Sequence, residues 1–199
     1  MAERMLGVVS LLHGADEQAV RDLWAELAAD FGLGEAPRRV PFPHVSYQIA
    51  ADYDRVRLEE ALAREAVRHA PIRVTLTGLG AFAAPEPVLY LAVERNAALD
   101  ALHAALWQSL VAGDVARQWS PLYAPGSWVP HITLAQLDLT LEGLRAIQSA
   151  WSGRDLRREV WLSDLALGGD PPGQQPEPDQ LGQQPLMRVA LGGVMGADG

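Results

Sequence analysis

The chain contains the same series of predicted elements twice, and this internal duplication constrains its fold more than any other feature. In each half the order is strand, helix, loop, a strand that opens with Pro-His, helix and strand. The first strands begin 82 residues apart (6 to 88), the Pro-His pairs 87 apart (43 to 130) and the last strands about 86 apart (72 to 158). We therefore predict an α+β protein of two pseudo-symmetric βαβαβ-type halves. The predicted strands are 6–12, 44–50, 72–82, 88–94, 131–139 and 158–169.

Both Pro-His pairs belong to near-copies of one tetrapeptide, Pro-His-Val-Ser at 43–46 and Pro-His-Ile-Thr at 130–133. Side chains two positions apart on a strand point to the same face, so each motif presents an imidazole beside a hydroxyl. One such motif arises easily by chance, but two at equivalent positions of a repeat do not. The predicted catalytic residues are His44, Ser46, His131 and Thr133.

A twofold-like packing of the two halves would bring these four side chains together across a groove. Two imidazoles can supply one proton acceptor and one proton donor near neutral pH, because the unperturbed pKa of histidine is about 6.5. Two hydroxyls can donate hydrogen bonds to the oxygens of an anion. Such a set suits acid–base catalysis on an anionic substrate.

Composition limits the other possibilities. The chain has no Cys and no Lys, which excludes thiolate chemistry, disulfides and every mechanism that needs a lysine. Its net charge of −9 disfavours binding along an extended nucleic acid, so we expect a small nucleotide or an RNA end as partner. No apolar run is long enough to cross a membrane, and the start is typical of a first strand. We expect a cytoplasmic monomer.

The segments PHVSYQIA (43–50) and WVPHITLAQ (128–136) resemble the 2H phosphoesterase superfamily, and within it the LigT-like 2′-5′ RNA ligases and RNA 2′,3′-cyclic phosphodiesterases. The resemblance implies a bilobal fold with largely antiparallel sheets flanking a central cleft and helices outside. It also implies hydrolysis of 2′,3′-cyclic phosphates to 2′-phosphates without metal or cofactor, and ATP-independent 2′-5′ joining. By this resemblance His44 is the proton donor and His131 the proton acceptor.

The expected organisation is one bilobal domain over residues 1–199. One lobe is expected to come mainly from 1–84, and the other from 85–169 with a closing strand over 185–193. The segment 170–185 is rich in Pro, Gln and Gly and is predicted to be a flexible linker.

Candidate substrate-binding residues flank the two motifs. Arg39 and Arg117 lie upstream of the histidines and could meet a phosphate, although either could be an ordinary exposed loop residue. Tyr123 and Trp128 could stack on a base, or close over the edge of the core. His103, beside an apolar helical face, is expected to be packed.

Two other functions stay open from the sequence. A nucleotide- or RNA-end-binding module could keep the cleft without turnover, but simple binding does not need two imidazoles. A metallohydrolase could use both motif histidines as ligands, but it needs a third ligand that neither motif supplies.

Overall fold

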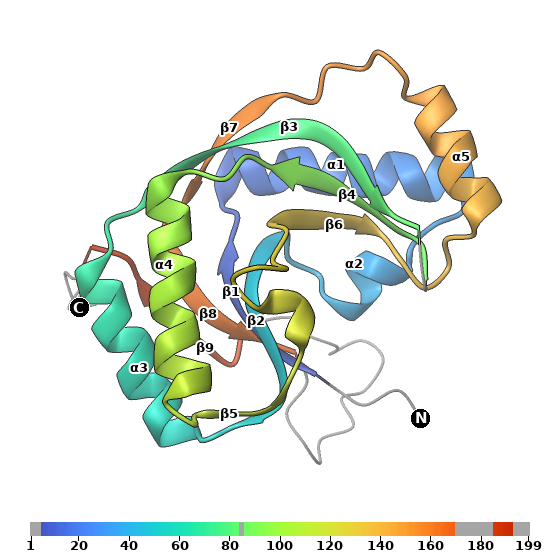
Figure 1. Ribbon diagram of the computed structural model, residues 1–199. Coiled ribbons are helices and arrows are strands. Elements are labelled where there is room, and N and C mark those ends of the chain that lie inside the picture. The colour runs from blue at the N-terminus through green and yellow to red at the C-terminus, as the bar shows by residue number, and fades with distance from the viewer. Residues whose placement is uncertain (1–4, 84–85, 170–184, 193–199) are drawn as a thin grey trace.

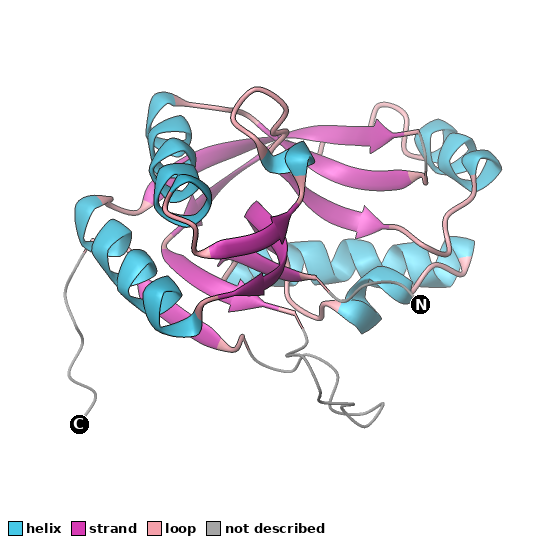
Figure 2. Cartoon of the chain, turned by 60° about the horizontal axis from the view of Figure 1, so that its bottom comes forward, coloured by secondary structure: helices cyan, strands magenta, loops and turns pink. Residues whose placement is uncertain are grey.

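The computed structural model describes residues 5–83, 86–169 and 185–192. Two antiparallel sheets form the centre of the molecule, and the helices lie around them (Figures 1 and 2). This confirms the predicted α+β class. The strands are β1 Leu6–Leu11, β2 His44–Tyr53, β3 Ile72–Phe82, β4 Val88–Val93, β5 Ala116–Trp119, β6 His131–Ala135, β7 Arg158–Leu162, β8 Asp164–Gly168 and β9 Met187–Ala190. The helices are α1 Gly14–Phe31, α2 Glu35–Arg39, α3 Arg55–Arg68, α4 Ala97–Trp107 and α5 Leu141–Ala150, with a π-helical turn Gln108–Ala112 and a 3₁₀ turn Pro121–Tyr123.

The two halves exchange their last strands. The sheet orders are β5-β2-β1-β8-β9 and β6-β4-β3-β7. In each sheet a motif strand lies beside the first strand of its own half, followed by the last strand of the other half. The predicted division into 1–84 and 85–169 plus a closing strand is therefore wrong for β3, which joins the second-half sheet, and for β5, β8 and β9, which join the first-half sheet.

Two features explain this exchange of strands: the burial of β1 and a break in the predicted strand at Ser163. Every residue of β1 is buried, so its backbone N–H and C=O groups need partner strands on both sides. β2 supplies one partner and β8 the other. The predicted strand 158–169 breaks at Ser163, which lets β7 pair with β3 while β8 crosses to β1.

The twofold relation between the halves can be read from the pairing of β3 with β7. Val74 lies opposite Val160, 86 residues further along, which is the spacing of the repeat. Equivalent residues thus face each other here, as they do on a twofold axis. The pseudo-twofold axis that relates the two halves therefore passes through this pair.

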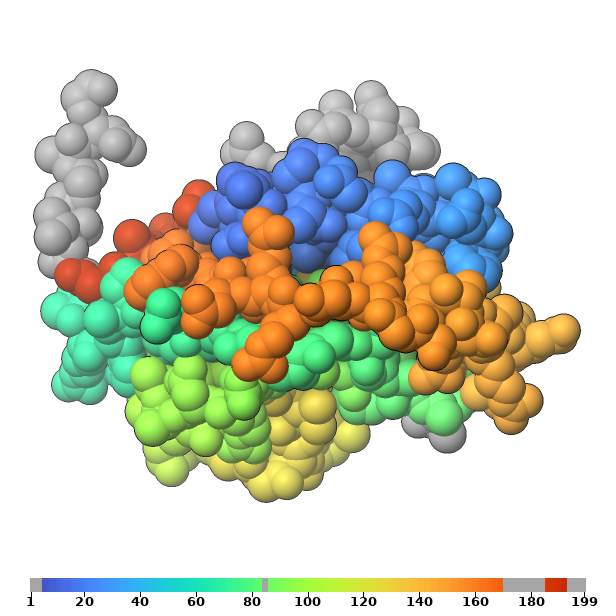
Figure 3. All heavy atoms as spheres, turned by 90° about the horizontal axis from the view of Figure 1, so that it is seen from above, coloured from blue at the N-terminus to red at the C-terminus, as the bar shows by residue number. Residues whose placement is uncertain are grey.

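Ion pairs join α1 to the segment that follows α5. Arg154 pairs with Glu26, and Arg158 pairs with Asp16. Seen from above, this segment (orange) runs between α1 (blue) and the β3–β4 region (green) (Figure 3). The contacts tie the first helix to the second half on the outside of the molecule.

The predicted linker 170–185 falls outside the described residues except for Pro185. In the part of the chain that the structure describes, no helix combines the length and hydrophobicity of a bilayer span.

Candidate active site

The structure brings the four motif side chains together in one cavity of about 440 Å³. His44 and Ser46 come from the start of β2, and His131 and Thr133 from the start of β6. All four are half-buried, whereas the aliphatic residue between each pair is fully buried. The alternation of each strand therefore anchors its motif in the core and turns the imidazole and the hydroxyl into the cavity.

Both imidazoles are held in the same way. Nδ1 of His44 donates to the carbonyl of Phe42 at 2.9 Å, and Nδ1 of His131 donates to the carbonyl of Val129 at 2.7 Å. Since a carbonyl oxygen can only accept, each Nδ1 carries a proton. Nε2 of each neutral ring is then the atom available for proton transfer.

Burial lowers the pKa of both histidines, and the hydrogen bonds to the backbone carbonyls partly oppose this. A positive charge on His131 lowers the pKa of His44 further. Protonation of His131 therefore disfavours protonation of His44. Acid–base catalysis by two imidazoles requires one ring to be protonated while the other is neutral.

Each hydroxyl-bearing residue is positioned by a tryptophan. Nε1 of Trp128 donates to the carbonyl of Ser46 at 2.8 Å, and Nε1 of Trp24 donates to the carbonyl of Thr133 at 3.2 Å. Both indoles are buried. Both tryptophans also line the cavity, and their hydrogen bonds hold the main chain of the two hydroxyl-bearing residues.

Trp128 lines the cavity, as expected of a binding residue, but its ring is covered and does not offer a free face to stack on a base. Its side chain is 2% exposed, and His103 stacks on its ring with centroids 3.8 Å apart and planes 4° from parallel. His103 is packed, as predicted, and its Nε2 donates to the carbonyl of Tyr123 at 3.0 Å. Together these rings fix the loop that precedes β6.

The other predicted binding residues divide into two groups. Tyr123 lines the cavity beside Ser46; burial raises the pKa of its phenol, and the Ser46 hydroxyl partly opposes that rise. Arg39, at the end of α2, and Arg117, on the edge strand β5, are exposed and do not line the cavity. The prediction that these two arginines lie at this site is therefore wrong.

An aromatic cluster supports the second histidine. The rings of Phe82 and Tyr90 lie 5.3 and 4.9 Å from that of His131. Gly80 allows this packing, because a Cβ there would overlap the Tyr90 ring. Phe82 belongs to the exchanged strand β3, so no sequence pattern within the second half indicated it.

Several other cavity residues were missed by the sequence analysis, because no motif marks them. They include Trp24, Ile49, Phe82, Glu86, Leu122 and Gln136. Over residues 5–83, 86–169 and 185–192, no three His, Asp or Glu side chains gather as a metal site.

Comparison with known proteins adds independent evidence. Residues 13–168 match the family model described as the 2′-5′ RNA ligase superfamily. The comparison with curated proteins gave no match. Among solved structures, E. coli LigT complexed with NADP+ is 18% identical with a TM-score of 0.55, covering 96% of this chain and 99% of LigT. The Thermus thermophilus protein TT0787 is 17% identical with a TM-score of 0.60, covering 95% of this chain and 98% of TT0787. At these identities the likeness shows the fold.

Proposed function

This chain belongs to the 2′-5′ RNA ligase superfamily of 2H phosphoesterases, and from that membership we propose that it is a metal-independent phosphodiesterase. Its substrate is a 2′,3′-cyclic phosphate, at an RNA end or in a small nucleotide, and its product is a 2′-phosphate. The observation that supports this most is the matched pair of imidazoles, each with Nδ1 bound to a carbonyl, which leaves Nε2 as the ring nitrogen for proton transfer. Relatives of the same fold include LigT complexed with 3′-AMP and with ATP.

The reaction assigns one proton transfer to each ring. Nε2 of His131, unprotonated, takes a proton from water as the water oxygen bonds to phosphorus. Nε2 of His44, protonated, gives its proton to the 3′ oxygen as the bond from phosphorus to that oxygen breaks. The hydroxyls of Ser46 and Thr133 donate to the non-bridging oxygens, where charge develops in the transition state. With a 5′-hydroxyl in place of water, the same transfers give a 2′-5′ linkage without ATP.

The direct test is hydrolysis of a nucleoside 2′,3′-cyclic phosphate with EDTA present. His44→Ala and His131→Ala should each lower kcat by about 10²–10⁴-fold, the usual contribution of a general acid or base. His69→Gln, at the end of α3, is the matched control and should leave kcat unchanged.

The product distinguishes the proposal from its alternatives. A 2′-phosphate from chelator-resistant turnover supports the two-histidine mechanism. Turnover abolished by EDTA would contradict it and favour a metallohydrolase. Nucleotide binding without turnover on either a mononucleotide or a cyclic-phosphate-ended RNA would favour the silent binding module.

A further inference from the structure

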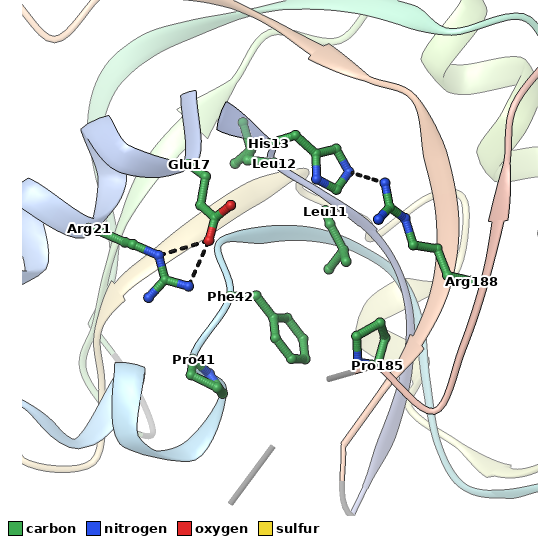
Figure 4. A pocket seen from close by; sticks show the side chains of 9 residues that line it. All are labelled: Leu11, Leu12, His13, Glu17, Arg21, Pro41, Phe42, Pro185 and Arg188. Atoms are coloured by element: carbon green, nitrogen blue, oxygen red, sulfur yellow. Dashed lines mark hydrogen bonds and ion pairs between the residues drawn. The ribbon is translucent and has the colours of Figure 1, made fainter. Parts of the chain in front are cut away.

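A second pocket of about 380 Å³ lies beside the candidate active site. We call it the Arg21–Arg188 pocket, after the two arginines that line it from α1 and β9 (Figure 4). Phe42 is part of its lining, and the ring of Phe42 meets that of His44 edge-on with centroids 6.2 Å apart. The pocket therefore adjoins the first catalytic histidine through one side chain.

The register of the first-half sheet places Arg188 on the catalytic face. Ser46 pairs with Val9, Val9 with Ala166, and Ala166 with Arg188. Residues directly opposite one another in a sheet project from the same face. Neighbouring strands are about 4.8 Å apart, so three steps put Arg188 about 14 Å from Ser46 on this face of the sheet. Val9 and Ala166 are buried in a cluster with Leu11 and Phe42, so this cluster separates the two cavities.

The guanidinium of Arg188 is oriented by a buried acid. Its Nε donates to Oδ2 of Asp164 at 2.6 Å, and Asp164 is 1% exposed and also accepts from the backbone N–H of Leu11. Nη2 of Arg188 lies 2.9 Å from Nε2 of His13, which also lies 2.8 Å from Asp164. One imidazole nitrogen cannot donate to the carboxylate and accept from Arg188 at once. When His13 donates to Asp164, Nη2 is free to donate to a ligand.

Arg21 lies on the other side of the pocket (Figure 4). Its Nε and Nη2 both contact one carboxylate oxygen of Glu17, at 2.8 and 2.7 Å, which orients this guanidinium as well. The Arg21 and Arg188 side chains keep 40% and 51% of their surface exposed. Two guanidinium groups held across a pocket are well suited to a phosphate, whose oxygens accept paired N–H donors.

We propose that the Arg21–Arg188 pocket binds an internal phosphate of an RNA strand whose cyclic-phosphate end lies between the two motif histidines. This rests on the proposed function and narrows its substrate to an oligonucleotide end. The span of about 14 Å corresponds to about four nucleotides if the strand stays stacked at about 3.4 Å each, and to fewer if it is extended.

The experiment compares kcat/KM for a nucleoside 2′,3′-cyclic phosphate with that for an RNA pentamer ending in the same group. The wild-type protein should prefer the pentamer. Arg188→Gln should lower kcat/KM on the pentamer by about 10-fold or more, since it removes a charged hydrogen bond. It should also lower the magnitude of the slope of log kcat/KM for the pentamer against log salt concentration by about one, the value expected for one phosphate contact. The rate on the mononucleotide should stay unchanged.

Two further variants separate ligand binding from damage to the fold. Arg188→Lys keeps the positive charge and should retain part of the preference. Arg21→Gln does not affect the contacts of Asp164, and it should still lower kcat/KM on the pentamer but not on the mononucleotide. The matched control is Arg73→Gln, since Arg73 is an exposed arginine of β3 paired with Glu159, and it should behave like wild type.

Equal kcat/KM on the two substrates in the wild type would overturn this inference and leave the proposed function standing. So would a pentamer preference that survives both Arg188→Gln and Arg21→Gln. Absence of turnover on both substrates would overturn the proposed function itself, and this inference with it.

Discussion

Replacing Trp128 with Phe should both destabilise the protein and impair its chemistry. The change removes the N–H that reaches the Ser46 carbonyl at 2.8 Å while keeping an aromatic ring over His103. A partly buried carbonyl left without its donor costs about 1–3 kcal/mol. The smaller ring leaves a space worth roughly 1 kcal/mol more. For a chain of this size a loss of about 2–4 kcal/mol corresponds to a fall in Tm of roughly 4–16 °C.

Thermal unfolding followed by circular dichroism measures the first effect, and steady-state hydrolysis of a cyclic phosphate measures the second. Because Ser46 would be less well fixed, we expect kcat to fall more than KM rises. Trp161→Phe is the control, since that side chain is 54% exposed on β7 and its replacement should change stability by less than about 0.5 kcal/mol.

A contact with the base would give the opposite pattern. If Trp128 stacked on the substrate, Tm would hardly change and KM would rise. The rise would disappear with ribose 2′,3′-cyclic phosphate, which has no base. That result would refute the positioning role argued from burial and from the Ser46 hydrogen bond.

Three further predictions concern the same cavity. The Gly80→Ala variant should lose activity because its Cβ displaces the Tyr90 ring, while Gly126→Ala, with open space around it, should match wild type in kcat. Thr133→Ala should lower kcat by about 10-fold or more without a large change in Tm, since it removes one donor to the transition state. Burial lowers the pKa of both motif histidines and of His103, so the unfolded chain binds more protons below pH of about 6.5 and stability should fall on acidification. Tm measured between pH 7 and 5 tests this, and His103→Gln should flatten the slope.

Much of the site could be predicted from local sequence, because the geometry of a single strand decides which side chains lie together in each motif. A histidine and a hydroxyl two residues apart share a strand face whatever the strand pairs with, so the motifs predicted His44 with Ser46 and His131 with Thr133. The twofold repeat then placed the two pairs opposite each other. Neither inference required knowledge of which strands are neighbours.

Pairing partners were the part that local pattern could not supply. Periodicity identified 72–82 and 158–169 as strands but carries no information on which sheet each joins, so the exchange of β3 and β8 was missed. The arginines upstream of the motifs failed for a related reason. Proximity in sequence to a histidine does not determine where an arginine side chain points. Arg117 lies on the outer edge strand β5, while Arg188, far along the chain, lies on the catalytic face of the first-half sheet.

The exchange also bears on how the active site is held together. Two lobes built from separate halves of a chain would meet at an interface and move relative to each other by default. Here β7 belongs to one sheet and β8 to the other, with Ser163 alone between them. Rotating one sheet against the other would have to bend the chain at Ser163, whose carbonyl accepts from the backbone N–H of Leu191 at 2.9 Å. The next residue, Asp164, is buried and bound to Leu11 of β1, so the bend would strain that contact as well. The spacing of the two imidazoles is therefore set by strands that continue from one sheet into the other, which is how donors and acceptors stay organised before the substrate arrives.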